Sequence, residues 1–190
     1  MKRSFDSRVD YSLLLPVFCL LVIGVVAIYI AVSHDYPNNV LPILGQQIAW
    51  IALGLVIGFV VMFFNTEFLW KVTPYLYVLG LALMVLPLVF YNPSLVASTG
   101  AKNWVSIGGT TLFQPSEFMK ISYILMLARV IVQFTQKHKE WRRTIPLDFL
   151  LIGWMIAFTI PVLLLLALQS DLGTALVFVA IFSGMVLLSG

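Results

Sequence analysis

Six long apolar runs dominate the sequence and restrict what it can fold into. They extend from Leu13 to Val32, Ile48 to Phe64, Val72 to Tyr91, Phe118 to Phe134, Phe149 to Leu168, and Leu172 to Ser189. A helix of about 20 mostly apolar residues crosses a bilayer and satisfies its own backbone polar groups there. Only 10% of the residues are charged, against about 25% in soluble domains. We therefore expect an all-α polytopic membrane protein, with about six transmembrane helices in a single membrane domain over residues 1–190.

Basic residues are distributed unevenly between the connectors, and this predicts the orientation. If the N-terminus is cytoplasmic, the outer connectors receive Lys102 alone, in the loop 92–113. The inner side, including the cytoplasmic loop 135–146, then receives Lys2, Arg3, Arg8, Lys71, Lys137, Lys139, Arg142 and Arg143. Because cytoplasmic loops carry an excess of Lys and Arg, we expect a multi-pass protein with a cytoplasmic N-terminus.

An acid and a base lie close together at the start of the fourth apolar run. Pro115 suits the first turn of a helix, and Glu117 in that turn is favoured by the helix dipole. Lys120 follows three residues later on the same face, so the two can pair. Two interpretations stay open: a structural pair whose lysine extends outward to the interface, or ionisable groups that face a polar cavity and mark function.

Asp171 lies in the tight turn between the last two runs. It can cap the helix that follows, or it can belong to a site, because the predicted topology places several polar residues at the same outer face. The residues that we expect to contact a substrate are Lys102, Trp104, Gln114, Glu117, Lys120 and Asp171. Arg129 is nine residues beyond Lys120 and therefore points to the other side of the helix, towards the inner interface.

Several kinds of site find no support in the sequence. Cys19 is the single cysteine, so neither an intrachain disulfide nor a cysteine-based metal site can form. His34 and His138 fall on opposite sides of the predicted membrane and cannot share a metal. There is no Walker loop, dinucleotide fingerprint or HExxH pattern. We predict no metal site and no nucleic-acid partner.

Three motifs, in this order, resemble those of the SEDS family of bacterial shape, elongation, division and sporulation proteins. They are Gly100-Ala101-Lys102-Asn103-Trp104, then Phe113-Gln114-Pro115-Ser116-Glu117 with Lys120, then Asp171-Leu172-Gly173-Thr174. The resemblance covers all 190 residues and is greatest to the elongation branch, as found in streptococci. Two positions depart from the family: Asn103 stands where many members have Arg, and Ser170 where many have Pro.

The resemblance implies a function and a set of partners. SEDS proteins of the elongation type are peptidoglycan glycosyltransferases that polymerise lipid II on the outer face of the cytoplasmic membrane, together with a class B penicillin-binding protein. Glycosyl transfer needs a base on the acceptor hydroxyl and stabilisation of the departing diphosphate. Lys102 and Lys120 would serve the second task, with Glu117 or Asp171 orienting them. The expected partners are lipid II, that penicillin-binding protein and membrane lipids.

The resemblance also implies that part of the machinery lies elsewhere. Family members have about ten spans, and an Asp thought to act in catalysis lies in a large outer loop after the seventh. This sequence stops after the sixth run, so we expect an N-terminal part with no catalytic residue, inactive by itself. A divalent cation could bind at the lipid diphosphate, but no ligand cluster is visible. Two alternative functions stay open: a flippase for the lipid-linked precursor, or a non-catalytic scaffold of the cell-wall synthesis complex.

Overall fold

The computed structural model describes residues 11–35, 37–108, 110–137 and 145–189. They contain six helices that are long and apolar enough to cross a membrane, which confirms the predicted number and the all-helical membrane part. The chain divides into two compact units, Met1–Thr66 and Glu67–Gly190. Lys2, Arg3, Arg8, His138, Lys139, Arg142 and Arg143, which carried much of the predicted orientation, lie outside the described residues.

The first unit is a helical hairpin of α1 (Tyr11–Asp35) and α2 (Val40–Val61), joined by a short 3-10 turn, η2 (Pro37–Asn39). The second helix begins eight residues before the predicted run at Ile48, so it includes part of the connector expected between the first two runs. Pro42 is compatible with this start because it falls in the first turn, where the missing N–H has no helical partner. None of the described side chains of α1 and α2 is buried.

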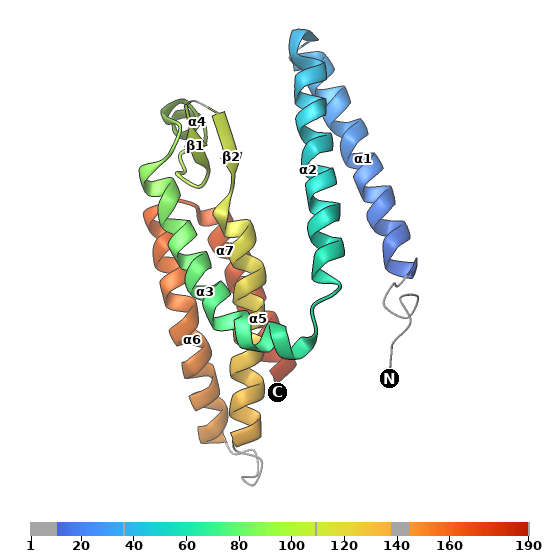
Figure 1. Ribbon diagram of the computed structural model, residues 1–190. Coiled ribbons are helices and arrows are strands. Elements are labelled where there is room, and N and C mark those ends of the chain that lie inside the picture. The colour runs from blue at the N-terminus through green and yellow to red at the C-terminus, as the bar shows by residue number, and fades with distance from the viewer. Residues whose placement is uncertain (1–10, 36, 109, 138–144, 190) are drawn as a thin grey trace. The chain divides into compact units, whose positions relative to one another are not determined.

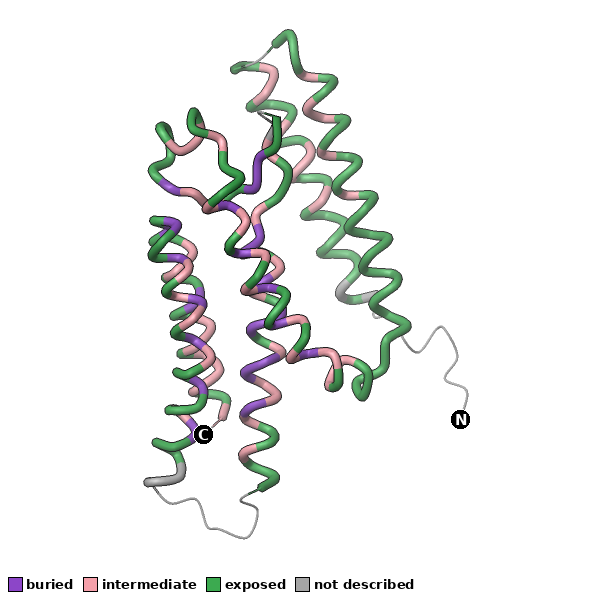
Figure 2. Tube along the Cα trace, turned by 60° about the vertical axis from the view of Figure 1, so that its left-hand side comes forward, coloured by how far each residue is buried: buried purple, intermediate pink, exposed green. Residues whose placement is uncertain are grey.

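The second unit is a bundle of α3 (Thr66–Val89), α5 (Pro115–Lys137), α6 (Ile145–Leu168) and α7 (Leu172–Ser189) (Figure 1). The α5 helix packs against both α6 and α7, and its buried positions form a continuous line (Figure 2). The fully buried side chains of the core are Met84, Met119, Tyr123, Leu127, Met155, Val162, Leu166 and Phe178. The bundle therefore has its own apolar core, to which α5 contributes more of the buried side chains than any other helix.

The predicted outer loop 92–113 is structured. It contains α4 (Pro93–Thr99) and an antiparallel hairpin of β1 (Val105–Ile107) and β2 (Thr110–Phe113). Asn92 caps α4 by accepting a hydrogen bond from the Ser94 N–H at 3.0 Å. Gly100 ends the helix with a φ of 75°, a conformation that glycine adopts without strain. The two short strands are an addition to the all-α architecture that the apolar runs predicted.

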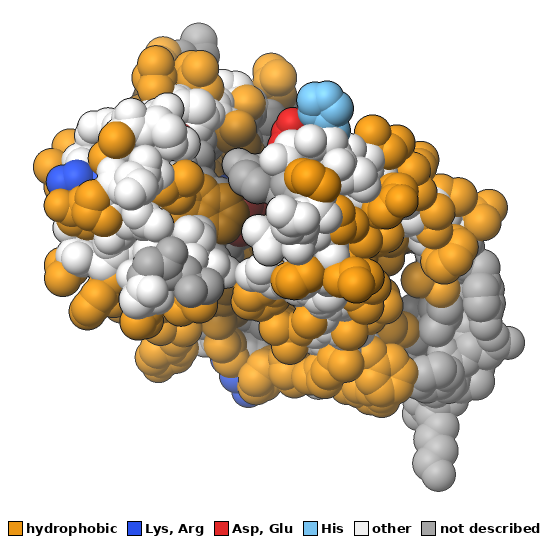
Figure 3. All heavy atoms as spheres, turned by 90° about the horizontal axis from the view of Figure 1, so that it is seen from above, with side chains coloured by type: hydrophobic (Ala, Val, Ile, Leu, Met, Phe, Trp, Pro, Cys, Tyr) orange, Lys and Arg blue, Asp and Glu red, His pale blue; other side chains and the backbone are white. Residues whose placement is uncertain are grey.

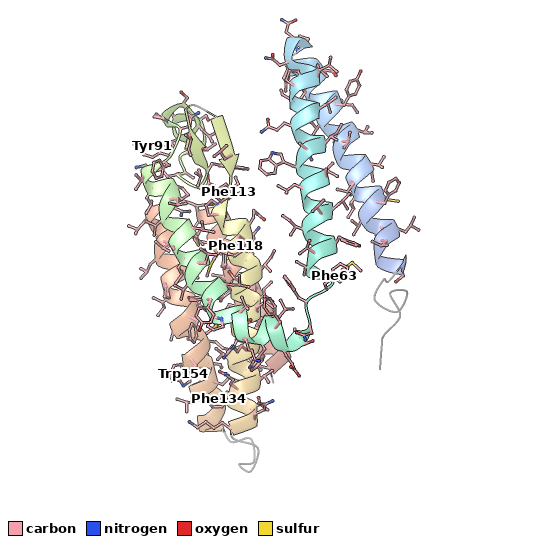
Figure 4. The ribbon with its side chains drawn as sticks, viewed as in Figure 1. Phe63, Tyr91, Phe113, Phe118, Phe134 and Trp154 are labelled. Carbon is pink, nitrogen blue, oxygen red and sulfur yellow. The ribbon has the colours of Figure 1, made fainter. Side chains whose placement is uncertain are left out.

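The hairpin is tied to the end of the bundle. The Ser106 N–H donates to the Phe90 carbonyl at 2.9 Å, so β1 is attached to the chain that leaves α3. Tyr91 and Phe113 lie at this same end of the bundle (Figure 4). The loop that connects α3 with α5 is thus held over the helix ends where the turn between α6 and α7 also lies (Figure 1).

The first turns of α3 are joined to α5 at a proline. Pro74 has no N–H, so the Trp70 carbonyl, four residues earlier, has no helical donor. The Arg129 guanidinium of α5 donates to that carbonyl and lies over the Trp70 ring, 5.1 Å from its centroid. Arg129 therefore supplies the hydrogen-bond donor that Pro74 cannot supply to the Trp70 carbonyl. The sequence did not predict this contact.

A second contact between α3 and another helix lies close to a proline. Pro161 lies inside α6 and removes the helical donor of the Ala157 carbonyl, four residues earlier. The neighbouring Phe158 carbonyl has the Val162 N–H as its ordinary helical donor, and it also accepts a hydrogen bond from the Tyr77 hydroxyl of α3 at 2.5 Å. The rings of Tyr77 and Phe158 also meet edge to face, with centroids 5.6 Å apart. These contacts join α3 to α6 in the middle of the bundle.

Candidate functional site

The turn between α6 and α7 has a well-defined hydrogen-bond pattern. The Asp171 N–H donates to the Leu166 carbonyl and the Ser170 N–H to the Ala167 carbonyl, both at 3.0 Å. These two bonds form a Schellman motif, which closes a helix with one residue in the left-handed conformation. That residue is Ser170, with a φ of 59°. The φ of proline is fixed near −65°, so proline, which many members of the resembled family have at this position, could not form this turn.

The positive φ of Ser170 leads to a prediction about stability. Glycine adopts a positive φ without the steric penalty of a Cβ, so we expect Ser170→Gly to raise the free energy of unfolding by about 1 kcal/mol. Ser183→Gly in the middle of α7 is the matched control, and we expect it to lower that free energy by about 0.5 kcal/mol. Denaturant titration of the protein in detergent micelles measures both. Equal destabilisation by the two substitutions would contradict the left-handed turn.

The Asp171 carboxylate is the centre of a hydrogen-bond network. Its side chain is buried, with 7% of the residue exposed. Oδ1 accepts from the Thr174 N–H at 3.0 Å, and Oδ2 accepts from the Thr174 hydroxyl at 2.7 Å. Oδ2 also accepts from Asn103 Nδ2 at 2.7 Å and from Gln114 Nε2 at 3.5 Å. The expected capping of α7 by Asp171 is confirmed, and the same carboxylate joins three segments that are far apart in the sequence.

The environment of Asp171 favours its charged form. Burial by itself would raise the pKa of this carboxyl, but the hydrogen bonds from Thr174, Asn103 and Gln114 outweigh burial and lower the pKa below its ordinary value. All of these donors are neutral, and within the described part of the chain no Lys or Arg is bonded to this carboxylate. The site thus holds a buried negative charge that is solvated by amide, hydroxyl and backbone groups.

Lys102 and Trp104 flank Asn103 in the outer loop. The backbone N–H of Lys102 donates to the Gln169 carbonyl at 2.8 Å, which attaches the loop to the turn beside Asp171. The Lys102 ammonium group lies 4.7 Å from the centre of the Tyr91 ring, a cation–π contact. Trp104 is 37% exposed. Both predicted side chains therefore lie at the end of the bundle that carries the network, without bonding to Asp171.

Glu117 and Lys120 form the predicted pair one turn apart. Lys120 Nζ lies 2.7 Å from Glu117 Oε1, and the lysine side chain is 26% exposed while that of the glutamate is 61% exposed. Among the residues that the structure describes, the pair makes no hydrogen bond to the Asp171 network. The structure therefore brings Gln114 and Asp171 into contact and leaves this pair as a separate charged group in the first turns of α5.

An apolar cavity borders the network. Its volume is about 260 Å³, and Asp171 and Ser170 are its polar lining residues. The other lining residues are apolar: Leu163, Leu166, Ala167, Leu172 and Ala175. Seen from this end of the molecule, the described surface consists mainly of hydrophobic and uncharged atoms, with few charged side chains (Figure 3). A buried carboxylate thus lies beside a space that suits an apolar group.

A second cavity, of about 330 Å³, lies between α5 and α6 at the opposite end of the bundle. Phe134 of α5 and Trp154 of α6 line it (Figure 4), and Lys137 and Gln133 are its polar residues. Neither cavity is lined by a set of metal ligands. In the described ranges, no three His, Cys, Asp or Glu side chains are close enough to hold a metal ion.

Two residues of the network, Asn103 and Thr174, and the adjacent Gln169 were absent from the sequence-based site. A signal existed for Thr174, because an aspartate at an N-cap accepts the backbone N–H of the second or third helical residue, and Thr174 is the third residue after Asp171. Asn103 was noted only as a departure from the family. In the structure it donates directly to Asp171, so an amide occupies the position where many members have a cation. Gln169 gave no signal, since its partner Met84 lies 85 residues away.

Comparisons with known proteins agree with the motifs. A family model described as cell cycle protein, which covers FtsW, RodA and SpoVE, matches residues 11–190. The peptidoglycan glycosyltransferase RodA of Treponema pallidum (strain Nichols) is 30% identical over 184 residues, which cover 97% of this chain and 39% of that protein. The peptidoglycan glycosyltransferase MrdB of Escherichia coli (strain K12) is 31% identical over 177 residues, or 92% of this chain and 43% of the relative.

A probable peptidoglycan glycosyltransferase FtsW of Hydrogenovibrio crunogenus is 28% identical over 185 residues, which cover 96% of this chain and 44% of that relative. The chain therefore spans about two fifths of the length of these curated relatives. No solved structure matches the chain significantly. The match of the family model over residues 11–190, together with the three motifs, shows that the chain belongs to the FtsW, RodA and SpoVE family of cell cycle proteins, the SEDS family.

Proposed function

We propose that the protein is a peptidoglycan glycosyltransferase of the RodA type, which polymerises lipid II on the outer face of the bacterial cytoplasmic membrane during cell elongation. The names of the relatives support this reaction class. The observation that carries the proposal is the arrangement at one end of the bundle. There the buried Asp171 network, an apolar cavity and the side chain of Lys102 lie together, and Lys120 lies in the first turns of α5.

This arrangement fits the chemistry of a lipid-linked sugar donor. Polymerisation breaks the bond between a sugar and the diphosphate carrier, so negative charge develops on the departing diphosphate. Lys102 and Lys120 supply positive charge for it, and Glu117 fixes the Lys120 ammonium group at 2.7 Å. Asp171 holds the side-chain amides of Asn103 and Gln114, and Trp104 offers an exposed ring beside them. The apolar walls of the 260 Å³ cavity suit isoprenoid units of the carrier.

Among the described residues, we assign none as the base that removes the proton from the acceptor hydroxyl. Glu117 is paired with Lys120, and the hydrogen bonds that Asp171 accepts lower its pKa, so its carboxylate is a weak base. A general base works best when its pKa lies near the operating pH. The roles of these residues are therefore substrate binding and orientation.

A reconstitution experiment tests the function. The protein, expressed from its complete coding sequence, is placed in liposomes with purified, fluorescently labelled lipid II and no other protein. We expect glycan chains to form. Translocation of the labelled lipid without polymer would instead support a flippase. The absence of both polymer and translocation would support a scaffold of the cell-wall complex. A class B penicillin-binding protein is the proposed partner, and adding it to the same liposomes should raise the yield of cross-linked glycan.

The proposed orientation places Lys102 outside the cell. Cys19 is the single cysteine of residues 1–190, so a protein with Cys19→Ser, and with any cysteine beyond these residues also replaced, carries one reporter thiol at a time. In intact cells, Lys102→Cys should react with a membrane-impermeant maleimide, whereas Lys137→Cys at the end of α5 should react only after the membrane is opened. The reverse pattern of labelling would overturn the cytoplasmic N-terminus.

A further inference from the structure

Gln169 is a fully buried polar side chain in the turn that carries Asp171. Only 2% of the residue is exposed. Its side-chain amide leaves the turn and reaches α3, where Nε2 donates to the Met84 carbonyl at 2.5 Å. Burying an amide is unfavourable unless it is hydrogen-bonded, so this contact fixes the direction of the side chain. The turn is therefore attached to a different helix through one residue.

The acceptor in α3 lies three residues before a proline. Pro87 lacks an N–H, so the carbonyl that loses its helical donor is that of Leu83, four residues earlier. The Met84 carbonyl has the Leu88 N–H as its ordinary helical donor, and its second lone pair accepts Gln169 Nε2. Pro87 itself is buried, so little water can reach this part of α3. Gln169 thus binds α3 through a backbone carbonyl that can accept a second donor.

The backbone of Gln169 makes a hydrogen bond to the outer loop. Its carbonyl accepts the Lys102 N–H at 2.8 Å. Asn103, the next residue of the outer loop, donates to Asp171, which is two residues after Gln169. Two parallel links therefore join the outer loop to the turn, one through the backbone of Gln169 and one through the side chain of Asp171.

We propose that Gln169 is a positioning residue, which holds the Asn103 amide against the Asp171 carboxylate by fixing the turn to α3. If the bond to Met84 is lost, the turn keeps its Schellman motif but can rotate relative to α3 and the outer loop. The bond between Asn103 and Asp171 depends on that relative position, because it joins side chains 68 residues apart. Gln169 acts on the site through Asn103 and contacts no reacting group.

The first test observes the Met84 carbonyl directly. Within residues 1–190, methionine labelled with ¹³C at the carbonyl and ¹⁵N-valine give signals only for the pairs Met84–Val85 and Met185–Val186, so Met185 in α7 is an internal reference. In solid-state NMR spectra of the protein in lipid bilayers, Gln169→Leu should move the Met84 carbonyl resonance upfield and leave that of Met185 unchanged. An unchanged Met84 resonance would show that Gln169 does not bond to α3.

The second test separates positioning from a purely structural role. Within residues 1–190, Asp171 is the only aspartate followed by leucine, so ¹³C-aspartate with ¹⁵N-leucine isolates its carboxyl signal for titration. We expect Gln169→Leu to raise the pKa of Asp171, because the Asn103 donor is lost. The same change should be much smaller in an Asn103→Ala background, since both substitutions remove one interaction. Gln136→Leu, an exposed position in α5, is the matched control and should leave the pKa unchanged.

A variant of the same size keeps the test valid if Gln169→Leu does not fold. Gln169→Glu fills the same space, and in this buried position the neutral carboxylic acid can still donate to Met84. It should therefore preserve both the Met84 resonance and the pKa of Asp171. An Asp171 pKa that is unchanged by Gln169→Leu, despite loss of the Met84 bond, would overturn the positioning role. Neither readout requires polymerase activity, so failure of the proposed reaction would leave this result intact.

Discussion

Replacing Lys120 with alanine is expected to lower the rate of lipid II polymerisation by about 100-fold, the usual loss when one preorganised donor is removed from a site of developing negative charge. The Lys120 ammonium group lies 2.7 Å from Glu117 and is only partly exposed, so its position is fixed before substrate binds. The measurement is the initial rate of glycan synthesis from purified lipid II by the protein expressed from its complete coding sequence.

Two further variants show whether the effect is local. Lys137→Ala removes the same charge from the other end of α5 and should leave the rate within about two-fold of the original, as expected for an exposed surface charge. Glu117→Ala leaves Lys120 charged but free to move, and we expect an intermediate loss of about 10-fold. If both Glu117→Ala and Lys120→Ala polymerise lipid II at the rate of the unaltered protein, the pair is not part of the proposed site.

Asp171→Asn is expected to destabilise the protein by about 2–3 kcal/mol at neutral pH. The carboxylate accepts four hydrogen bonds, whereas an asparagine side chain must direct an NH₂ group at some of those donors. The donors on Asn103 and Gln114 are then left without an acceptor in partly buried positions. Asp148→Asn, an exposed position in the first turn of α6, is the control and should cost at most about 0.5 kcal/mol.

The same hydrogen bonds to Asp171 also predict the direction in which the free energy of unfolding changes with pH. The pKa of Asp171 is lower in the folded protein than its ordinary value, because the hydrogen bonds outweigh burial. Its contribution to stability is therefore complete above the ordinary pKa and is lost as the pH falls through the lower folded value. Denaturant titrations over the acid range should show a smaller loss of stability on acidification for Asp171→Asn than for the unaltered protein. Parallel pH profiles would show that the carboxylate is not held in its charged form.

The membrane helices could be predicted from the sequence because the signal is local and large. An apolar run of about 20 residues needs no partner to be recognised, and all six runs are helical in the structure. The boundaries were less certain. The second helix begins at Val40 rather than near Ile48, since Gln46 and Gln47 interrupt the apolar run without interrupting the helix. The strands from Val105 to Phe113 were missed because three or four residues carry little periodicity.

The candidate site was predictable only in part, for a physical reason. Glu117 and Lys120 were paired correctly because helix geometry relates residues three apart. The contacts of Asp171 with Asn103 and Gln114 join positions 68 and 57 residues apart, and they depend on how the outer loop folds over the helix ends. Contacts between positions so far apart in the sequence produce no periodic pattern of residues from which they could be predicted. The predicted topology placed these groups on one face, and only the structure shows which of them meet.

The donation from Arg129 to the carbonyl that Pro74 leaves without a helical donor has a consequence for biogenesis. The helix α3 is synthesised before α5 and α6, yet the donor for its Trp70 carbonyl is Arg129, 59 residues later in the chain. A carbonyl without a donor costs several kcal/mol in lipid, so α3 released alone from the translocon would be incomplete. Likewise, the Tyr77 hydroxyl of α3 finds its acceptor, the Phe158 carbonyl, in α6, which is inserted later. The helix α3 therefore reaches its final state only when the later helices have arrived.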